Sequence, residues 1–335
     1  MATEKGRIFF LGAGFSAGAG IPLTNKLLPM AARLFQSEAA GLFGRVANYA
    51  NEVDVDFEGN PNAEDFSKLC THLEFLELRE YAGGERWSSD GSREKVALKF
   101  YLAKAIALSA PESHQIPNHY LEFADSLTPD DIIVTFNWDL LLESALKKVG
   151  KAYSYNWKTG QIHILKLHGS INWINNPPTS FRNRKRQFGY QPLGYKDGLM
   201  ENEIYSSEEL HIKNSWHEAH ALQDEVKPKI ILPGYGKPFE VRDLAILWYR
   251  IEFLNLRQGG VSVIGLNISP DDFIVESLFR YLLRSVISQE RTIRVLNPDS
   301  NVFDRFSKIS GGRQCDYHCD VFGPSSLGKA LLVEN

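Results

Sequence analysis

Short apolar runs alternate with stretches of helical periodicity along most of the chain. Apolar runs of roughly four to eight residues, bounded by turn residues, are typical of buried strands in a parallel sheet. Such runs lie at 7–11, 132–136, 162–167, 229–232, 261–266 and 292–296. Helical patterns lie at 25–35, 62–80, 92–110, 140–148, 243–256 and 273–285. Strands that alternate with helices predict an α/β fold with a Rossmann-like, mostly parallel sheet and helices on both of its faces.

Two segments depart from this alternation. Residues 24–128 carry helical patterns but no strand pattern, which predicts a mainly helical insertion after the first strand. Residues 174–228 contain a Pro-Pro pair, scattered glycines and the basic run 182–186, which together are typical of a loop-rich subdomain. We interpret the short basic run as a solvated loop, with contact to a nucleic acid or an acidic partner as the alternative.

Composition adds the class of protein and its expected compartment. At 335 residues, 43% of them hydrophobic and 23% charged, the chain can bury a large core, and we interpret 1–335 as one domain carrying both segments. The net charge of -4 gives no electrostatic reason to expect direct nucleic-acid binding. Three scattered cysteines, Cys70, Cys315 and Cys319, argue against a disulfide framework and favour a reducing compartment. With no signal-peptide pattern and no apolar stretch of roughly 18 residues, we expect a cytoplasmic protein without membrane contact.

A glycine-rich turn follows the first strand directly. Residues 12–16 read Gly-Ala-Gly-Phe-Ser, and further glycines follow at 18 and 20. Glycines let the backbone turn sharply, so that successive N–H groups can cradle a pyrophosphate, to which the hydroxyl of Ser16 would add a donor. The spacing differs from Gly-x-Gly-x-x-Gly, and a structural turn without a ligand would also account for it. No Gly-Lys-Ser/Thr follows, which excludes a Walker A loop.

Polar residues follow two later strands. Asn137 and Asp139 come directly after the strand predicted at 132–136, and His168 follows the strand predicted at 162–167. Ligands of open α/β sheets bind outside the carboxyl ends of the strands, so we expect these side chains to converge with the glycine-rich turn. Each also has a structural interpretation: Asn137 or Asp139 as a helix cap, and His168 as a core histidine with its hydrogen bonds satisfied.

Five segments in order along the chain carry a family resemblance. The turn at 12–22 (Gly-Ala-Gly-Phe-Ser…Gly-Ile-Pro) resembles the NAD-binding signature of the sirtuins. Thr-Phe-Asn-Trp-Asp at 135–139 is similar to their Thr-Gln-Asn-Ile-Asp motif, and Leu-His-Gly at 167–169 resembles their catalytic histidine motif. Val-Ile-Gly-Leu-Asn at 263–267 takes the place of the family's Gly-Thr-Ser strand end, and Val-Leu-Asn at 295–297 resembles its adenosine-contacting Ile-Asn.

The likeness is greatest to the divergent bacterial sirtuin-like domains of antiviral defence systems. These share an Asn-Tyr/Trp-Asp-x-Leu-Leu-Glu pattern, matched at 137–143, and an acidic pair after the late glycine strand, matched at 269–272. Classical deacetylases carry a zinc module with two Cys-x-x-Cys pairs, and this chain has no such pair, so we expect no zinc and no metal ligands. The Asp-Phe-Arg after Gly-Ile-Pro is replaced here by Leu-Thr-Asn at 23–25, which leaves open how the nicotinamide pocket closes.

The resemblance implies an NAD+ hydrolase that cleaves the nicotinamide–ribose bond with Asn137 and His168 as catalytic residues, as an NAD-depleting effector of anti-phage defence. The alternatives are an NAD-dependent protein deacylase and a non-catalytic sensor of NAD or ADP-ribose. Since unrestrained NAD loss would poison the cell, we expect gating by homo-oligomerisation or by a separately encoded translocase-like ATPase or Argonaute-type protein. The residues expected to contact NAD are Gly12, Ala13, Gly14, Phe15, Ser16, Gly20, Asp139, Gly265, Asn267 and Asn297.

Overall fold

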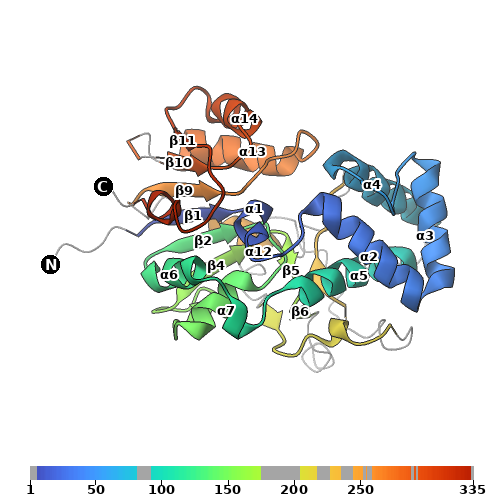
Figure 1. Cartoon of the computed structure of the whole chain (residues 1–335). Coiled ribbons are helices and arrows are strands. Elements are labelled where there is room, and N and C mark those ends of the chain that lie inside the picture. Colours follow the sequence, from blue (N-terminus) through green and yellow to red (C-terminus); the bar gives the residue numbers. More distant parts are fainter. Residues whose placement is uncertain are drawn as a thin grey trace, which may run out of the picture.

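A seven-stranded parallel sheet forms the centre of the computed structural model (Figure 1). The structure describes residues 6–80, 92–174, 204–216, 227–234, 244–251, 254, 259–287, 290–291 and 293–332. The strands are β1 (Ile8–Leu11), β2 (Ile132–Thr135), β3 (Tyr153–Ser154), β4 (Ile162–Lys166), β9 (Val261–Ile264), β10 (Ile293–Leu296) and β11 (Asp316–His318). Their order is β11-β10-β9-β1-β2-β4-β3, and all their pairings are parallel. When β3 at the edge is left out and the other six strands are numbered in chain order, the order from β4 to β11 is 3-2-1-4-5-6, which is that of a Rossmann sheet.

Helices cover both faces of this sheet. Phe9 and Phe10 are consecutive in β1, so their side chains point to opposite faces. The ring of Phe9 packs 5.2 Å from Phe123 of α6 (Asn118–Ser126), whereas Phe10 packs 4.9 Å from Phe279 of α13 (Phe273–Tyr281). The fold class predicted from the sequence, a Rossmann-like α/β protein with helices on both faces, is therefore confirmed.

Four helices form a separate group beside the carboxyl ends of the strands (Figure 1). They are α2 (Thr24–Glu38), α3 (Ala40–Glu52), α4 (Ala63–Glu80) and α5 (Arg93–Ser109). Helix α5 is buried from Lys95 to Ala107, and its Tyr101 stacks on Phe35 of α2 at 4.5 Å between ring centroids. Two lysines of α5 form ion pairs inside this group: Lys95 lies 3.3 Å from Glu74, and Lys104 lies 2.5 Å from Glu38. The described part of 24–128 contains helices and no strand. That this segment is an insertion within one domain stays a prediction.

Several elements differ from the sequence prediction. The run at 229–232 was expected to join the parallel series, but β8 (Lys229–Ile230) pairs antiparallel with β5 (Gly169–Ser170) outside the main sheet. The chain reaches that position because it reverses direction at Gly169, whose φ is +79°. The edge strands β3 and β11 and the helix α3 were not predicted. All three residues of β11 are half-buried, so they lack the continuous apolar run that identified the central strands.

The remaining elements complete the chain. The helix expected at 273–285 divides into α13 and a π-helical turn at Leu282–Val286. Of the helix expected at 243–256, the structure describes α12 (Ala245–Arg250). The basic run 182–186 and most of the predicted subdomain 174–228 lie outside the described residues. The other elements within the described residues are α1 (Ala13–Ala17), α7 (Leu141–Lys148), α14 (Asn301–Ser310), α15 (Leu327–Ala330), β6 (Trp173–Ile174), β7 (Tyr205–Ser206) and the 3₁₀ turns Ser113–Gln115 and His211–Lys213.

Across the described residues, no helix combines the length and the apolar character needed to cross a membrane.

Candidate functional site

The turns after β1 and β9 interlock at the carboxyl edge of the sheet. These neighbouring strands flank the point where the strand order reverses, which is where open α/β sheets bind ligands. The amide of Gly12 donates to the carbonyl of Ile264 at 3.0 Å, and that of Gly14 donates to Gly265 at 2.8 Å. A Cβ on Gly12 would lie 2.6 Å from the Gly265 carbonyl oxygen, so only glycine permits this approach. Gly265 itself has a left-handed φ of +58°.

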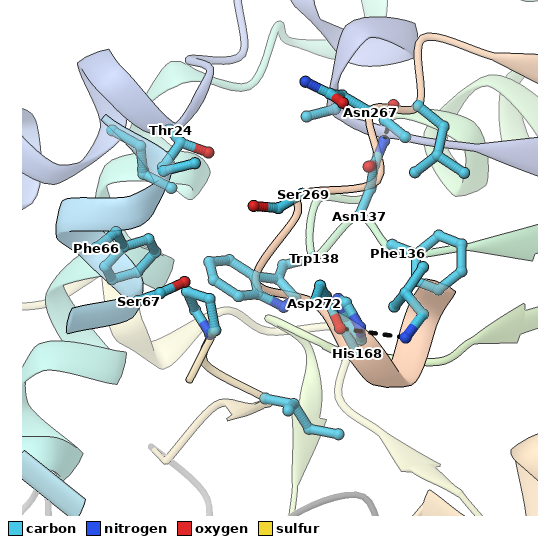
Figure 2. Close-up of a pocket in the computed structure, with 18 of the residues that line it drawn as sticks. Thr24, Phe66, Ser67, Phe136, Asn137, Trp138, His168, Asn267, Ser269 and Asp272 are labelled. Carbon is cyan, nitrogen blue, oxygen red and sulfur yellow. Dashed lines mark hydrogen bonds between the residues drawn. The ribbon is translucent and has the colours of Figure 1, made fainter. Parts of the chain in front are cut away.

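A cavity of about 240 Å³ opens beside this junction. The turns after β1, β2, β4 and β9 form one wall, to which they contribute Gly12, Asn137, His168 and Asn267 among others. Helices α2, α4 and α5 form the opposite wall. Figure 2 shows Thr24, Phe66 and Ser67 on that side, facing Asn137 and Ser269 across the space. The helical group thus encloses a site to which the sheet contributes Asn137, His168 and Asn267, and the helices contribute Thr24 and Ser67.

Asn137 is held in a defined orientation by the first turn. Its Nδ2 donates to the carbonyl of Gly12 at 2.9 Å and to the hydroxyl of Ser16 at 3.2 Å. Its backbone amide donates to Thr135 Oγ1 at 3.1 Å. Since the two protons of the amide group are directed to these acceptors, Oδ1 is the atom of Asn137 that can accept a hydrogen bond from a ligand.

His168 lies at the end of the neighbouring strand and lines the same cavity. Its ring packs edge-to-face on Phe136, with 5.0 Å between the ring centroids. Its carbonyl accepts a hydrogen bond from the amide of Ile231 at 2.8 Å, which fixes the backbone on the far side of the ring. The structure therefore brings Asn137 and His168, which are 31 positions apart (168 − 137), to one cavity.

Asp139 lines the same cavity. It is buried, and its Oδ1 accepts from the amide of Leu141 at 3.0 Å, which caps the start of α7. Burial raises the pKa of the Asp139 carboxyl above its ordinary 3.8, while the positive charge of Lys166 acts in the opposite direction. Asp139 therefore serves as a helix cap and also lines the cavity.

The raised pKa of Asp139 predicts that the stability difference between wild type and Asp139→Asn depends on pH. The asparagine retains an oxygen that can cap α7. Because the folded pKa lies above the unfolded one, the carboxyl's contribution to stability is complete below pH 3.8 and is lost as pH rises through the folded pKa. Asparagine does not titrate, so the free energy of unfolding of the variant should increase relative to wild type as pH rises. Urea unfolding of both proteins at about pH 4 and pH 7 measures this difference. A fall in the variant's free energy of unfolding relative to that of wild type between these two pH values would contradict the prediction.

Several residues predicted to contact NAD lie beside the cavity or away from it. Gly12, Ala13, Asp139 and Asn267 line it. The ring of Phe15 is buried between Tyr120, Phe123 and Phe322. Asn297 is buried and donates to the carbonyl of Leu266 at 3.2 Å, so it fastens the turn after β9. Four more of the predicted residues lie outside the lining: Gly14, Ser16, Gly20 and Gly265. The amide of Gly14 donates to Gly265, the hydroxyl of Ser16 accepts from Asn137, and Gly20 is exposed.

The cavity also contains residues to which the sequence analysis gave no individual role. Trp138 lies between Asn137 and Asp139 and faces the space in Figure 2. Phe66 and Ser67 come from α4, which has no sequence link to the strand ends, so no motif identified them. Thr24 belongs to the segment 23–25, which the sequence marked only as the place where Asp-Phe-Arg is replaced. Ser269, Asp271 and Asp272 follow β9; Asp272 Oδ1 caps α13 by accepting from Val275 at 3.2 Å (Figure 2). The acidic pattern at 269–272 was noted in the sequence, but its place in the cavity was not.

Within the described part of the chain, no group of three or more His, Cys, Asp or Glu residues is arranged to hold a metal ion. Close to the cysteines at 315 and 319, His318 Nε2 lies 3.0 Å from Asp316 Oδ2, and the side chain of Cys319 is exposed.

No family model matches the chain, and no curated protein does. Among solved structures, the chain is similar to Sir2Tm bound to a propionylated peptide, with 14% sequence identity and a TM-score of 0.40 over 98% of this chain and 92% of that one.

Proposed function

We propose that this protein is an NAD+ hydrolase that cleaves the nicotinamide–ribose bond to give nicotinamide and ADP-ribose. One observation carries the proposal: Asn137 and His168, at the ends of adjacent parallel strands, line one cavity that extends to Gly12 and Ala13 at the start of α1. In this arrangement the nicotinamide riboside enters the cavity, and the pyrophosphate lies towards Gly12 and Ala13.

The charge of the cavity suits a pyridinium. Among its described lining residues are three carboxylates, Asp139, Asp271 and Asp272, and neither lysine nor arginine. A cleft lined by one sign of charge attracts the opposite sign, so it favours the cationic ring of NAD+. The apolar side chains of Ile21, Leu27 and Phe66 supply contact surface for the flat ring.

The chemistry needs few catalytic groups. Nicotinamide leaves NAD+ as a neutral base, so its departure requires no general acid. The ribose develops oxocarbenium character, as in glycoside cleavage, and a nucleophile must be placed against it. In our proposal His168 is the general base for water or a ribose hydroxyl, and Asn137 Oδ1 orients that water or hydroxyl. The carboxylate of Asp139 stabilises positive charge nearby.

Product identification tests the proposal. The purified protein, at high concentration and together with the products of its genomic neighbours, is incubated with NAD+, with and without an acetylated lysine peptide, and the products are separated by liquid chromatography and mass spectrometry. We expect nicotinamide and ADP-ribose in equal amounts, with or without peptide. O-acetyl-ADP-ribose formed only with peptide would identify a deacylase instead, and bound, uncleaved NAD+ would identify a sensor.

Asn137→Ala is expected to lower kcat for NAD+ cleavage by roughly 10²-fold, because the water or ribose hydroxyl loses its acceptor and moves out of line. Steady-state kinetics measure this effect. Asn48→Ala, at an exposed position of α3, makes the same chemical change away from the cavity and should leave kcat unchanged. Equal kinetics for the two variants would remove Asn137 from the mechanism.

We further propose that the activity is gated in the cytoplasm, as part of anti-phage defence, by self-association or by a separately encoded partner. The support is chemical: continuous NAD+ loss is incompatible with growth. Assays of the chain alone and with the products of its genomic neighbours, at increasing protein concentration, test this. Full activity of the dilute, isolated chain would contradict it.

A further inference from the structure

A buried ion pair lies behind the cavity and outside its lining. Lys166 Nζ is 2.9 Å from Glu143 Oε1, and the two side chains are 1% and 7% exposed. Neither residue lines the main cavity, so neither touches a ligand there. Buried ion pairs contribute little to stability because desolvation offsets their attraction, so stability alone is a weak reason for this pair.

The ammonium also binds the backbone of the site. Lys166 Nζ donates to the carbonyl oxygen of Asp139 at 2.5 Å, and Glu143 Oε1 accepts a second hydrogen bond from Tyr155 at 2.9 Å. Lys166 is the last residue of β4 and is in register with Thr135, the last residue of β2. Asn137 and His168 each follow two residues later. Lys166 therefore joins the two chain segments at the point where both leave the sheet.

A second connection holds the same segment. The carbonyl of Trp138 accepts from the amide of Ile171 at 3.1 Å, so Lys166 at the end of β4 and Ile171 after it bond to two successive carbonyls, those of Asp139 and Trp138. Packing does not fill the space behind them. A small cavity of about 10 Å³ lies there. It is lined by the apolar residues Leu11, Phe15 and Leu142 and by the polar residues Ser16, Thr135, Asn137, Asp139, Glu143 and Lys166. Directed polar bonds therefore hold this segment where close packing is incomplete.

We propose that Lys166, neutralised by Glu143, is a positioning residue that fixes the segment 137–139 against the end of β4 and so sets Asn137 relative to His168. This inference rests on the proposed function for its catalytic consequence. Its structural part, that the ammonium holds the segment, does not depend on the reaction.

The test uses a charge-neutral double variant, K166M/E143Q, since K166M alone leaves a buried carboxylate without its cation and is expected to unfold more easily. Glutamine retains the oxygen that accepts from Tyr155. The matched control is K104M/E38Q, which removes the Lys–Glu pair between α5 and α2, neither of whose residues lines the cavity. For each protein, kcat and KM for NAD+ are measured, together with hydrogen exchange of the amides of residues 136–141.

For K166M/E143Q we expect kcat to fall at least about tenfold with KM changed by less than about twofold, and exchange in 136–141 to accelerate selectively. The control should retain wild-type kcat and exchange in that segment. Wild-type kcat and exchange in K166M/E143Q would overturn the inference, as would an equal loss of kcat in the control. If the wild type cleaves no NAD+ even at high concentration and with the products of its genomic neighbours, the proposed function fails, and the exchange comparison alone decides whether Lys166 holds the segment.

Discussion

Replacing His168 with alanine is expected to lower kcat for NAD+ cleavage by roughly 10²- to 10⁴-fold, the usual worth of a general base. The substitution removes the imidazole from the cavity wall, while the backbone bond from Ile231 to the carbonyl of residue 168 remains. The fold should therefore survive, and KM should change little if the imidazole acts mainly in the transition state. Single-turnover and steady-state measurements of nicotinamide release, with a thermal melt of each protein, separate catalysis from folding.

The control for this variant is His114→Ala. His114 lies in the 3₁₀ turn Ser113–Gln115, and its side chain is 74% exposed. It should show wild-type turnover and stability, because exposed substitutions away from special features change little. Wild-type turnover in His168→Ala would remove the general base from the mechanism and with it the main support for hydrolysis.

The largest expected effect on stability is that of Gly12→Ala. A Cβ at this position would be 2.6 Å from the carbonyl oxygen of Gly265 and 2.8 Å from Cβ of Leu266. These atoms belong to the turn after β9 and cannot rotate away like the end of a side chain. The turn would have to move from β1 and lose the bond from Gly12 to Ile264. We expect a loss of at least about 3 kcal/mol in the free energy of unfolding, measured by urea titration.

Gly44→Ala is the matched control. Gly44 lies inside α3, and a Cβ there would meet no atom within 4 Å. Alanine is the better helix former, so this variant should gain about 0.5–1 kcal/mol. Opposite signs for the same Gly→Ala change would show that close backbone approach at Gly12 is the cause. A small effect at Gly12 would mean that the turn after β9 adjusts more readily than its bonds indicate.

These results bear on how the glycine-rich turn is interpreted. The sequence analysis assigned its glycines and amides to a bound pyrophosphate. In the structure, the amides of Gly14 and Phe15 donate to the carbonyls of Gly265 and Gly12, and Gly12 and Ala13 alone of residues 12–16 line the cavity. The glycines are thus explained first by the contact between the two turns, which brings the ends of β1 and β9 together.

The central strands and their ends could be predicted from the sequence. Apolar runs such as that at 132–134 identify buried parallel strands, because both faces of such a strand are covered and nearly every position is apolar. Since ligands of such sheets bind at the carboxyl ends, the positions of Asn137 and His168 after two strands were sufficient to predict that they converge. Edge strands such as β11 escaped prediction because their residues are half-buried and lack that pattern.

The residues that surround those side chains could be identified from the three-dimensional structure alone. Phe66 and Ser67 face Asn137 across the cavity because α4 packs beside the sheet, and helical periodicity specifies a buried face without specifying its partner. The role of Lys166 as a positioning residue could not be predicted either, since a lysine at the end of a strand is expected to face solvent. Its burial against Glu143 and the Asp139 carbonyl depends on the register of β2 and β4 and on the path of the chain into α7. Long-range packing sets these relations, and the local pattern that defines each element does not contain them.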